Sequence, residues 1–236
     1  MNNANDLPQP FHIRALKKAL RTVTPRVPIV AELGQQFALE SMPFNPQTVI
    51  KGYINGMFFT PHKSKIYWQA PPTRALIPIE DFHVPKNIKR LIRQEKFEVR
   101  HDTSFEKVMR MCAEREEESW ITDDIIGVYL KLHKMGVASC VEAWQDGELV
   151  GGLYGIRIGS YFATESQFHT VRDAGKVAFV ALFEILKSNG YLLHDVQYMT
   201  PYLDQFGAIS MADSEFKDMM TEAVIKPAGW FPEIKS

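Results

Sequence analysis

Residues 149–166 read LVGGLYGIRIGSYFATES, and this stretch decides how the rest of the chain is interpreted. Its apolar and aromatic residues predict two strands, over about 148–158 and 161–167. Gly159-Ser160 lies between them and predicts a turn, so the two strands should pair as an antiparallel hairpin. The stretch therefore favours a sheet-containing domain.

Gly151, Gly152 and Gly155 fall inside the first of these strands. Glycine weakens a strand interior, so this density indicates that another backbone or a ligand approaches closely there. Glu165 is a lone acid near the end of the second strand. A carboxylate at that place is a candidate polar anchor for a bound substrate, which makes this hairpin the first candidate for a functional site.

Helical and strand patterns continue on both sides of the hairpin. Predicted helices cover 12–21, 46–55, 86–93, 104–115, 123–136, 173–188 and 214–224, and further predicted strands cover 75–79, 138–144 and 192–197. Antiparallel strands followed by a strand–helix–strand crossover predict an α+β (mixed α/β) class, with helices packed on a mixed sheet. The proline-rich text before residue 75 predicts two domains, 1–74 and 75–236.

The bulk composition narrows the protein class. The 236 residues are 45% hydrophobic and 23% charged, with a net charge of −1, as expected of a globular protein that buries a core. Cys112 and Cys140 are the two cysteines, so a disulfide framework is not expected. The chain shows no secretory signal and no apolar run of roughly 18 residues. We expect a cytoplasmic monomer without a membrane, metal or cofactor requirement.

One predicted helix carries a row of cations. Lys86, Lys89, Arg90 and Arg93 follow the i, i+3, i+4, i+7 spacing that places four charges on one face. We call this the cationic ridge. It is interpreted either as a solvated surface or as a ridge that contacts nucleic-acid phosphates without reading sequence.

Asp195 and Gln197 lie two residues apart on the strand that follows the crossover helix, so they are predicted to share a face. The carboxyl end of such a strand is where open α/β sheets bind ligands. The alternative is a polar strand end that pairs with its neighbours. Aromatic residues such as Trp68, Trp120 and Phe162 are either core residues or pocket residues by their sequence pattern alone.

With these residues assembled, the chain resembles the bacterial leucyl/phenylalanyl-tRNA–protein transferases over about residues 45–220. The segments that carry the resemblance are Gly56-Met57-Phe58, Tyr67-Trp68, Pro71, Arg74, Arg115, Trp120-Ile121-Thr122, Tyr129, Leu132-His133, Gly136, Val141-Glu142-x-Trp144, 149–155, Gly159, Phe162, Glu165-Ser166, Phe168, Ala174, Lys176, Asp195-x-Gln197 and Gly207-Ala208.

Some positions depart from the family pattern. They are Thr164, Gln167 and His169 where the family has Gly, Met and Ser, Gly175 where it has Ser, Tyr202 and Gln205 where it has His and Ser, and Phe58-Phe59-Thr60 in place of Phe-Pro-Trp-Phe. Because these changes gather near the expected substrate sites, they bear on which amino acid is transferred and which acceptor is used.

The resemblance implies a small N-terminal domain followed by a domain of the GNAT (acetyltransferase-like) fold. It implies an enzyme that moves Leu, Phe or a similar residue from aminoacyl-tRNA to the N-terminal amine of an acceptor protein, usually one that begins with Lys or Arg. The marked protein is then degraded through an N-degron pathway. The partners expected are therefore the 3′ end of aminoacyl-tRNA and acceptor proteins.

The resemblance also suggests residue roles. Asp195 and Gln197 would hold the acceptor amine and the 3′-adenosine, with Asp195 accepting the amine proton directly or through Gln197. Glu165 would orient the amine or the ribose. Leu153, Phe162 and Phe179 would line the aminoacyl pocket, Trp68 and Trp120 would stack on the terminal adenine, and Lys86, Lys89, Arg90 and Arg93 would contact the tRNA. On this view Asp195→Ala abolishes transfer and leaves the fold intact.

Three alternatives remain at this point. The first keeps the chemistry but transfers a different residue such as Arg, or uses an acidic acceptor terminus. The second is a non-catalytic tRNA- or degron-binding module, against which the joint presence of Glu165, Asp195 and Gln197 argues. In the third, the tRNA's own hydroxyl relays the protons and the protein mainly positions the substrates.

Overall fold

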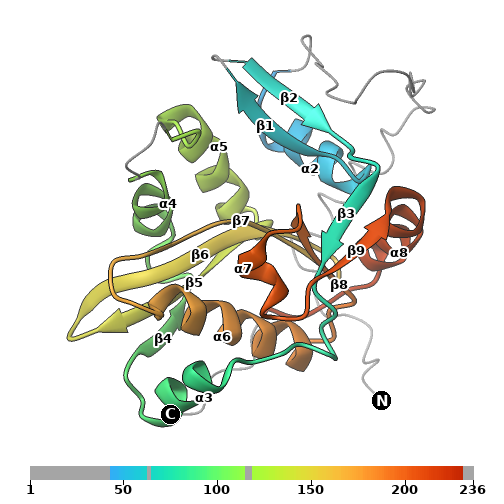
Figure 1. Ribbon diagram of the computed structural model, residues 1–236. Helices are drawn as coiled ribbons and strands as arrows, with labels where there is room; N and C mark the ends of the chain where they lie inside the picture. The colour runs from blue at the N-terminus through green and yellow to red at the C-terminus, as the bar shows by residue number, and fades with distance from the viewer. Residues whose placement is uncertain (1–42, 63–64, 115–118, 231–236) are drawn as a thin grey trace, which may run out of the picture.

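The structure is a computed structural model, and it describes residues 43–62, 65–114 and 119–230 (Figure 1). Its centre is a seven-stranded sheet in the order β4-β5-β6-β7-β8-β3-β9, and a separate hairpin pairs β1 with β2. The strands are β1 Phe58–His62, β2 Lys65–Gln69, β3 Thr73–Leu76, β4 Glu98–His101, β5 Ala138–Gln145, β6 Glu148–Ile158, β7 Tyr161–His169, β8 Leu193–Gln197 and β9 Ile209–Ala212. The mixed α/β class predicted from the sequence is confirmed.

Seven helices surround the sheet within the described residues. They are α2 Pro46–Ile54, α3 Lys86–Arg93, α4 Phe105–Ala113, α5 Asp123–Lys134, α6 Ala174–Ser188, α7 Pro201–Asp204 and α8 Asp213–Ile225. Local sequence explains where several of them begin. The side chains of Asn45 and Thr122 accept hydrogen bonds from the backbone N–H groups of Thr48 and Ile125, and thereby cap α2 and α5.

Helix α4 begins without a capping side chain from its own segment. Ser104 occupies the N-cap position, but its side chain makes no capping hydrogen bond. Instead the buried carboxylate of Glu142 accepts the backbone N–H groups of Thr103 and Ser104, both at 2.8 Å. A negative charge at a helix N-terminus is favourable, so a residue of β5 caps α4 through the tertiary fold.

The turns of the sheet follow their sequence signals. Asp146 and Gly147 have φ values of 52° and 79°, which is the pair of left-handed residues that a two-residue hairpin turn requires between β5 and β6. Gly159, with φ 59°, is the residue with positive φ in the turn between β6 and β7. Gly136, with φ 71°, follows α5 and ends the helix in a left-handed conformation, which glycine adopts readily.

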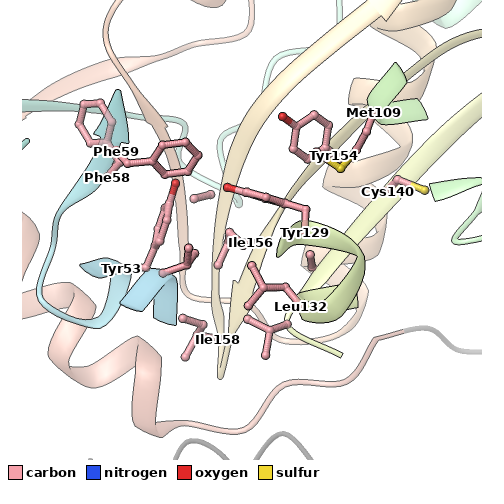
Figure 2. Close-up of a cluster of buried hydrophobic side chains, with 14 of the residues drawn as sticks. Tyr53, Phe58, Phe59, Met109, Tyr129, Leu132, Cys140, Tyr154, Ile156 and Ile158 are labelled. Carbon is pink, nitrogen blue, oxygen red and sulfur yellow. The ribbon is translucent and has the colours of Figure 1, made fainter. Parts of the chain in front are cut away.

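Two hydrophobic clusters fill the two sides of the sheet. The first cluster joins one sheet face to α2, α4, α5, α8 and the β1–β2 hairpin, and Figure 2 shows its tyrosines and aliphatic residues. The second cluster joins the other sheet face to α3 and α6. Neighbouring strand residues alternate between them: Cys140 and Tyr154 belong to the first cluster, Val141 and Leu153 to the second. The molecule is therefore layered, with the sheet in the middle.

The helices predicted over 46–55, 86–93, 104–115, 123–136, 173–188 and 214–224 are confirmed with small shifts at their ends, and so are the strands of the 138–167 region. The predicted helix over 12–21 lies outside the described residues. The short elements β1, β2, β4, α7 and β9 were not expected. The domain boundary expected near residue 75 falls within β3, which pairs with β8 and β9.

Candidate active site

Among the described strands of the seven-stranded sheet, β7 and β8 form the one parallel pair. These two strands separate toward their carboxyl ends. Pairing runs from Tyr161–Leu193 to Ala163–Asp195 and then stops, although β7 continues to His169 and β8 to Gln197. The carboxyl ends of the two strands therefore diverge at one edge of the sheet. Ligands of α/β sheets bind at this kind of opening between strand ends.

A β-bulge places Glu165 at this opening. On β6, Gly155 pairs with Thr164 and the next residue, Tyr154, pairs with Ser166, so Glu165 has no partner across the ladder. An extra residue of this kind bends its strand and re-aims the side chain. The bulge turns Glu165 toward the first cluster, where it meets helix α2.

Glu165 is held in a largely apolar, aromatic environment. The hydroxyl of Tyr53 on α2 donates a hydrogen bond of 2.5 Å to Oε1 of Glu165. Glu165 keeps partial exposure, whereas Tyr53 is fully buried. Burial raises the pKa of the Glu165 carboxyl to about 8, against the opposing effect of the Tyr53 hydrogen bond. Figure 2 shows the hydroxyls of Tyr53 and Tyr129 pointing toward one another in this part of the cluster.

Asp195, on the neighbouring strand, is fully buried and fully engaged. Arg74 donates to it from Nε (2.9 Å to Oδ1) and from a terminal nitrogen (2.7 Å to Oδ2). The hydroxyl of Tyr161 donates to Oδ2 at 2.7 Å. These contacts occupy both carboxylate oxygens, so Asp195 is a buried anchor and has no free oxygen facing a substrate.

The side chain of Arg74 is held in place by two aromatic rings and a backbone carbonyl in addition to Asp195. Its guanidinium lies between the rings of Phe58 and Phe216, at 4.5 and 4.6 Å from their centroids. It also donates a hydrogen bond of 3.0 Å to the carbonyl of Gly56. The neighbouring Asp195 carboxylate raises the pKa of Arg74 further, so the ion pair stays charged. Arg74 thus joins β3, β8, the α2–β1 turn and α8.

Gln197 ends β8 with a left-handed φ of 63°. Its backbone N–H donates a hydrogen bond of 2.8 Å to Oδ1 of Asp195. The side-chain Nε2 is buried and makes no hydrogen bond of normal geometry within the described residues. The same side chain nevertheless lies close enough to Glu165 to lower the pKa of that carboxyl. Glu165 and Gln197 therefore face one another across the diverging strand ends.

Comparison with known proteins decides the family. The family model described as leucyl/phenylalanyl-tRNA protein transferase matches residues 76–221. The chain belongs to the leucyl/phenylalanyl-tRNA protein transferase family. The protein of that name from Herpetosiphon aurantiacus is 45% identical over 181 residues, which cover 76% of this chain and 94% of the relative. The one from Paramagnetospirillum magneticum is 40% identical over 195 residues, covering 80% and 93%.

Solved structures resemble the chain more distantly. The structure of L-PGS from Bacillus licheniformis gives a TM-score of 0.43 at 10% identity, covering 80% of this chain and 71% of that one. A GCN5-related N-acetyltransferase-like protein from Streptococcus suis gives 0.33 at 14% identity, covering 69% and 65%. Similarity at this level carries no argument about function.

In this member of the transferase family, the residues expected to line the aminoacyl pocket lie in closed core. Leu153, Phe162 and Phe179 are all buried and belong to the second cluster, on the face of the sheet away from Tyr53 and Tyr129. The structure does not bring them into contact with the Glu165 side chain.

The two tryptophans expected to stack on adenine differ in access. Trp68 is 1% exposed and its ring fills the space over Gly52, where a Cβ would lie 1.8 Å from the ring. Trp120 is partly exposed and packs edge-on against Phe59, with ring centroids 5.8 Å apart. Of the two, only Trp120 has an accessible ring surface on which a base could stack. Trp68 is part of the hydrophobic core.

The cationic ridge is solvent-exposed as predicted, with Lys86, Lys89, Arg90 and Arg93 all on the surface of α3. Of the isoleucines on the same helix, Ile88 is buried, whereas Ile92 is 42% exposed. Helix α3 packs near α6, at the bottom of Figure 1, while α2 lies at the top. The ridge and Glu165 therefore lie in different layers of the molecule.

The structure explains the glycines of β6 by packing within the protein, and not by the approach of a ligand that the sequence suggested. A Cβ at Gly151 would lie 2.7 Å from the backbone at the start of α6, and one at Gly155 would lie 2.2 Å from the carbonyl of Ala163 and 2.6 Å from the ring of Phe162. These contacts are with the protein's own helix and neighbouring strand. The expected close approach is real, but the described structure fills it with α6, Phe162 and β7.

Three features of the site were not recognised from the sequence: the Tyr53–Glu165 hydrogen bond, the role of Arg74, and the bulge at Glu165. Tyr53 and Arg74 are 112 and 121 residues from their partners, so no local pattern connects them. Arg74 appeared only as a position of family resemblance. The feature that distinguishes Arg74 is its burial among aromatic residues. A single sequence does not reveal burial, so this feature could not be used.

Within the described ranges, no helix combines the length and apolar character that crossing a membrane requires. The same residues contain no group of three or more His, Cys, Asp or Glu side chains that could hold a metal ion.

Proposed function

We propose that the protein transfers Leu or Phe from aminoacyl-tRNA to the N-terminal amine of acceptor proteins, at the opening between β7 and β8. The observation that carries this proposal is the position of Glu165 and Gln197, each two residues beyond the last β7–β8 pair at the diverging strand ends, in a chain of this transferase family. A carboxyl and an amide that face one another there supply the two functions that aminolysis of an ester needs, a proton acceptor and a polar donor.

The reaction proceeds by attack of the neutral acceptor amine on the ester carbonyl carbon. A C–N bond forms and the carbonyl electron pair moves to oxygen, while the amine proton passes to the Glu165 carboxylate. The oxyanion then collapses, the bond to the ribose oxygen breaks, and that oxygen takes up the proton from Glu165, either directly or by relay through the neighbouring ribose hydroxyl. The products are a peptide bond and free tRNA.

Glu165 suits this proton transfer because of its environment. The pKa of its carboxyl is raised to about 8 by burial, and an N-terminal α-amine titrates at roughly 7.7–8.0. A general acid–base group is most effective when its pKa lies near the operating pH, and an α-amine with this pKa is partly neutral there. Asp195, which the sequence suggested as proton acceptor, is occupied by Arg74 and Tyr161, and its role in the proposal is to position Gln197.

Substrate recognition uses the surroundings of this opening. Trp120 is the proposed stacking partner of the terminal adenine, because it is the accessible one of the two tryptophans. The cationic ridge on α3 is the proposed contact for the tRNA phosphates. Leu153, Phe162 and Phe179 remain the proposed apolar lining of the pocket for the aminoacyl side chain. The proposal also includes acceptors that begin with Lys or Arg, a role in an N-degron pathway, and action as a cytoplasmic monomer; resemblance to the family supports these parts.

A transfer assay with purified protein tests the proposal. Leu- and Phe-charged tRNAs are combined with peptides that differ only in their N-terminal residue, and peptide mass is measured. We expect mass increases of one Leu or Phe on Lys and Arg peptides. Glu165→Gln should remove them, whereas Glu148→Gln at the exposed start of β6 should not. Tight binding of charged tRNA without any transfer would instead identify a binding module.

One observation favours a second candidate, transfer of a different residue. Gln167 and Tyr202 both depart from the family pattern, and they are neighbours in space, because the Gln167 side chain lowers the pKa of the Tyr202 hydroxyl against the effect of burial. A polar pair at this place fits a donor side chain with a hydrogen-bonding group. Adding Arg-, Tyr- and Met-charged tRNAs to the assay, and acidic-terminus peptides, distinguishes the two candidates.

A further inference from the structure

The side chain of His194 on β8 is buried in the second cluster and bonds to the neighbouring strand. It is 1% exposed, and its ring lies among the rings of Phe162, Phe179 and Phe183, with centroid distances of 6.0, 5.8 and 4.7 Å. Nε2 of His194 lies 2.8 Å from the hydroxyl oxygen of Thr164 on β7. Burial lowers the pKa of His194 to about 3, so the imidazole is neutral at physiological pH and the contact joins two neutral groups.

This hydrogen bond offsets part of the cost of burying the imidazole. Nδ1 of His194 makes no hydrogen bond within the described ranges. The imidazole therefore depends on Thr164, because loss of that hydroxyl would leave both ring nitrogens buried without a partner. The family pattern has Gly at the position of Thr164, and glycine has no side chain to bond. The hydrogen bond between His194 and Thr164 thus distinguishes this chain from the family pattern.

The hydrogen bond lies where the pairing of β7 with β8 stops. Phe162 pairs with His194, and the next pair, Ala163 with Asp195, is the last one between these strands. Thr164 follows on β7 and shares the second-cluster face with Phe162, because side chains two residues apart point to the same side of a strand. The Thr164 hydroxyl thus reaches diagonally to His194 and ties the two strands together one residue beyond their last backbone pair.

The same threonine is the residue after which the bulge begins. Thr164 pairs regularly with Gly155 on β6, whereas Glu165 has no partner across the ladder. A bulge bends its strand and re-aims a side chain, so the direction of the extra residue depends on how the residue before it is held. Thr164 is held by β6 on one side and by His194 on the other. The turn of Glu165 toward Tyr53 therefore starts from a fixed backbone.

We propose that His194 and Thr164 are positioning residues for the transfer reaction: their hydrogen bond on one face of the sheet fixes the bulge that aims Glu165 at the other face. The inference rests on the proposed function, in which Glu165 accepts the amine proton. In this role neither His194 nor Thr164 touches the reacting atoms, and neither transfers a proton. Loss of the hydroxyl lets the β7 backbone shift at the bulge, so Glu165 loses its alignment with the amine and part of its burial.

Two substitutions at one position separate the hydrogen bond from packing. Thr164→Val keeps the branched shape and removes the hydroxyl, whereas Thr164→Ser keeps the hydroxyl and removes a methyl group. Thr164→Val should lower kcat by about 10–100-fold, the loss expected when a reacting group is misplaced by about 1 Å, with KM for charged tRNA and peptide near wild type. Thr164→Ser should retain most of kcat. The matched control is Thr170→Val, which removes a hydroxyl that bonds the carbonyl of Val150 beyond the end of β7 and should leave kcat unchanged.

A measurement without substrate distinguishes positioning from a general loss of activity. NMR of isotope-labelled glutamate carboxyls follows the pKa of Glu165, and Glu165→Gln identifies its signal. Thr164→Val should move this pKa from about 8 toward the ordinary value of 4.5, because the displaced carboxyl is less buried. The variant leaves unchanged the groups that face Glu165, which are Tyr53 on α2, Tyr129 on α5, Tyr161 on β7, Arg74 on β3, and Asp195 and Gln197 on β8.

A double variant covers the case in which Thr164→Val fails to fold. His194→Phe with Thr164→Val replaces both polar groups by apolar ones, so the fold should persist while kcat stays low. Wild-type kcat or an unchanged pKa of Glu165 in these variants would overturn the positioning role, and the proposed function would stand if Glu165→Gln is inactive. Equal losses of kcat in Thr164→Val and Thr164→Ser would overturn that role as well. If the wild-type protein transfers no residue, the proposed function and this role both fail.

Discussion

Glu165 combines three conditions that seldom meet in one carboxyl: a bulge aims it, a tyrosine hydroxyl holds it, and burial raises its pKa to about 8. Each condition comes from a different element, so the residue owes its properties to packing. The charged and titratable groups around it are Tyr53, Tyr129, Tyr161, Arg74 and Asp195. Desolvation outweighs the favourable charge of Arg74, and this balance sets the protonation state.

The first prediction at this scale concerns stability and pH. The folded-state pKa of Glu165 lies above its ordinary value near 4.5, so between about pH 5 and pH 8 the folded protein retains a proton that the unfolded chain has lost. Stability from this group is therefore present at low pH and declines as pH rises toward 8. The amide in Glu165→Gln does not titrate, so the variant does not lose this stability as pH rises. The free energy of unfolding of the variant relative to wild type should therefore rise by about 1–3 kcal/mol between pH 5 and pH 8.

Urea unfolding of both proteins across this range measures the difference. A stability difference that stays constant with pH would show that the pKa of Glu165 is ordinary in the folded protein. The partial exposure of the side chain keeps the expected change below the full linkage value for the whole shift.

At the scale of elements, the Arg74–Asp195 pair decides how β3, β8 and the α2–β1 turn are joined. Both side chains are fully buried, and the pair connects residues 121 positions apart. A buried ion pair contributes less to net stability than its short N–O distance suggests, because the cost of removing both charges from water offsets their attraction. Breaking it by removing one partner is costly, however, since the other charge stays buried and uncompensated.

Asp195→Ala should therefore destabilise the fold by about 3–5 kcal/mol, in contrast to the sequence-based expectation of an intact fold. The double variant Arg74→Met with Asp195→Leu should recover much of this loss, because two apolar side chains replace two charges, but it should not recover transfer. Denaturant unfolding and the transfer assay measure the two properties separately. Glu98→Ala, which breaks the exposed pair with Arg100, serves as the control and should change little.

If Asp195→Ala proved as stable as wild type and merely inactive, Asp195 would be a catalytic group in the sense that the sequence suggested. Equal recovery of stability and transfer in the double variant would show that the pair acts only on folding.

At the scale of the whole molecule, the layers place the proposed tRNA contacts apart. The cationic ridge lies on α3 next to α6, while Glu165 faces α2 and α5. A bound tRNA that uses both must extend around one edge of the sheet. Such a partner is bound mostly through phosphates, and its affinity then depends on salt.

Lys89→Glu with Arg90→Glu should weaken binding of charged tRNA and reduce the slope of log K against log salt by about 1 for each phosphate that the variant no longer binds. Filter binding at several salt concentrations measures this. Lys131→Glu with Lys134→Glu on α5 is the matched comparison, because both lysines are exposed but lie on the layer of Glu165. If only the α5 pair weakens binding, the acceptor stem runs along α5 and the ridge is a solvated surface.

The sequence by itself determined the elements whose signals are local. Gly159-Ser160 predicted the turn between β6 and β7, and the apolar pattern over 123–136 predicted α5. It also identified Glu165 and Gln197 through family resemblance. Short strands such as β4 and β9 escaped because four residues carry too little alternation to predict a strand.

Only the tertiary structure decided what these residues do. It paired Asp195 with Arg74 and thereby made an expected proton acceptor into an anchor. It turned Glu165 onto Tyr53 through a bulge, and it filled the space beside Gly151 and Gly155 with the protein's own atoms. The reason is physical: hydrogen bonding and burial set the charge and reach of a side chain, and both depend on partners far away in the sequence.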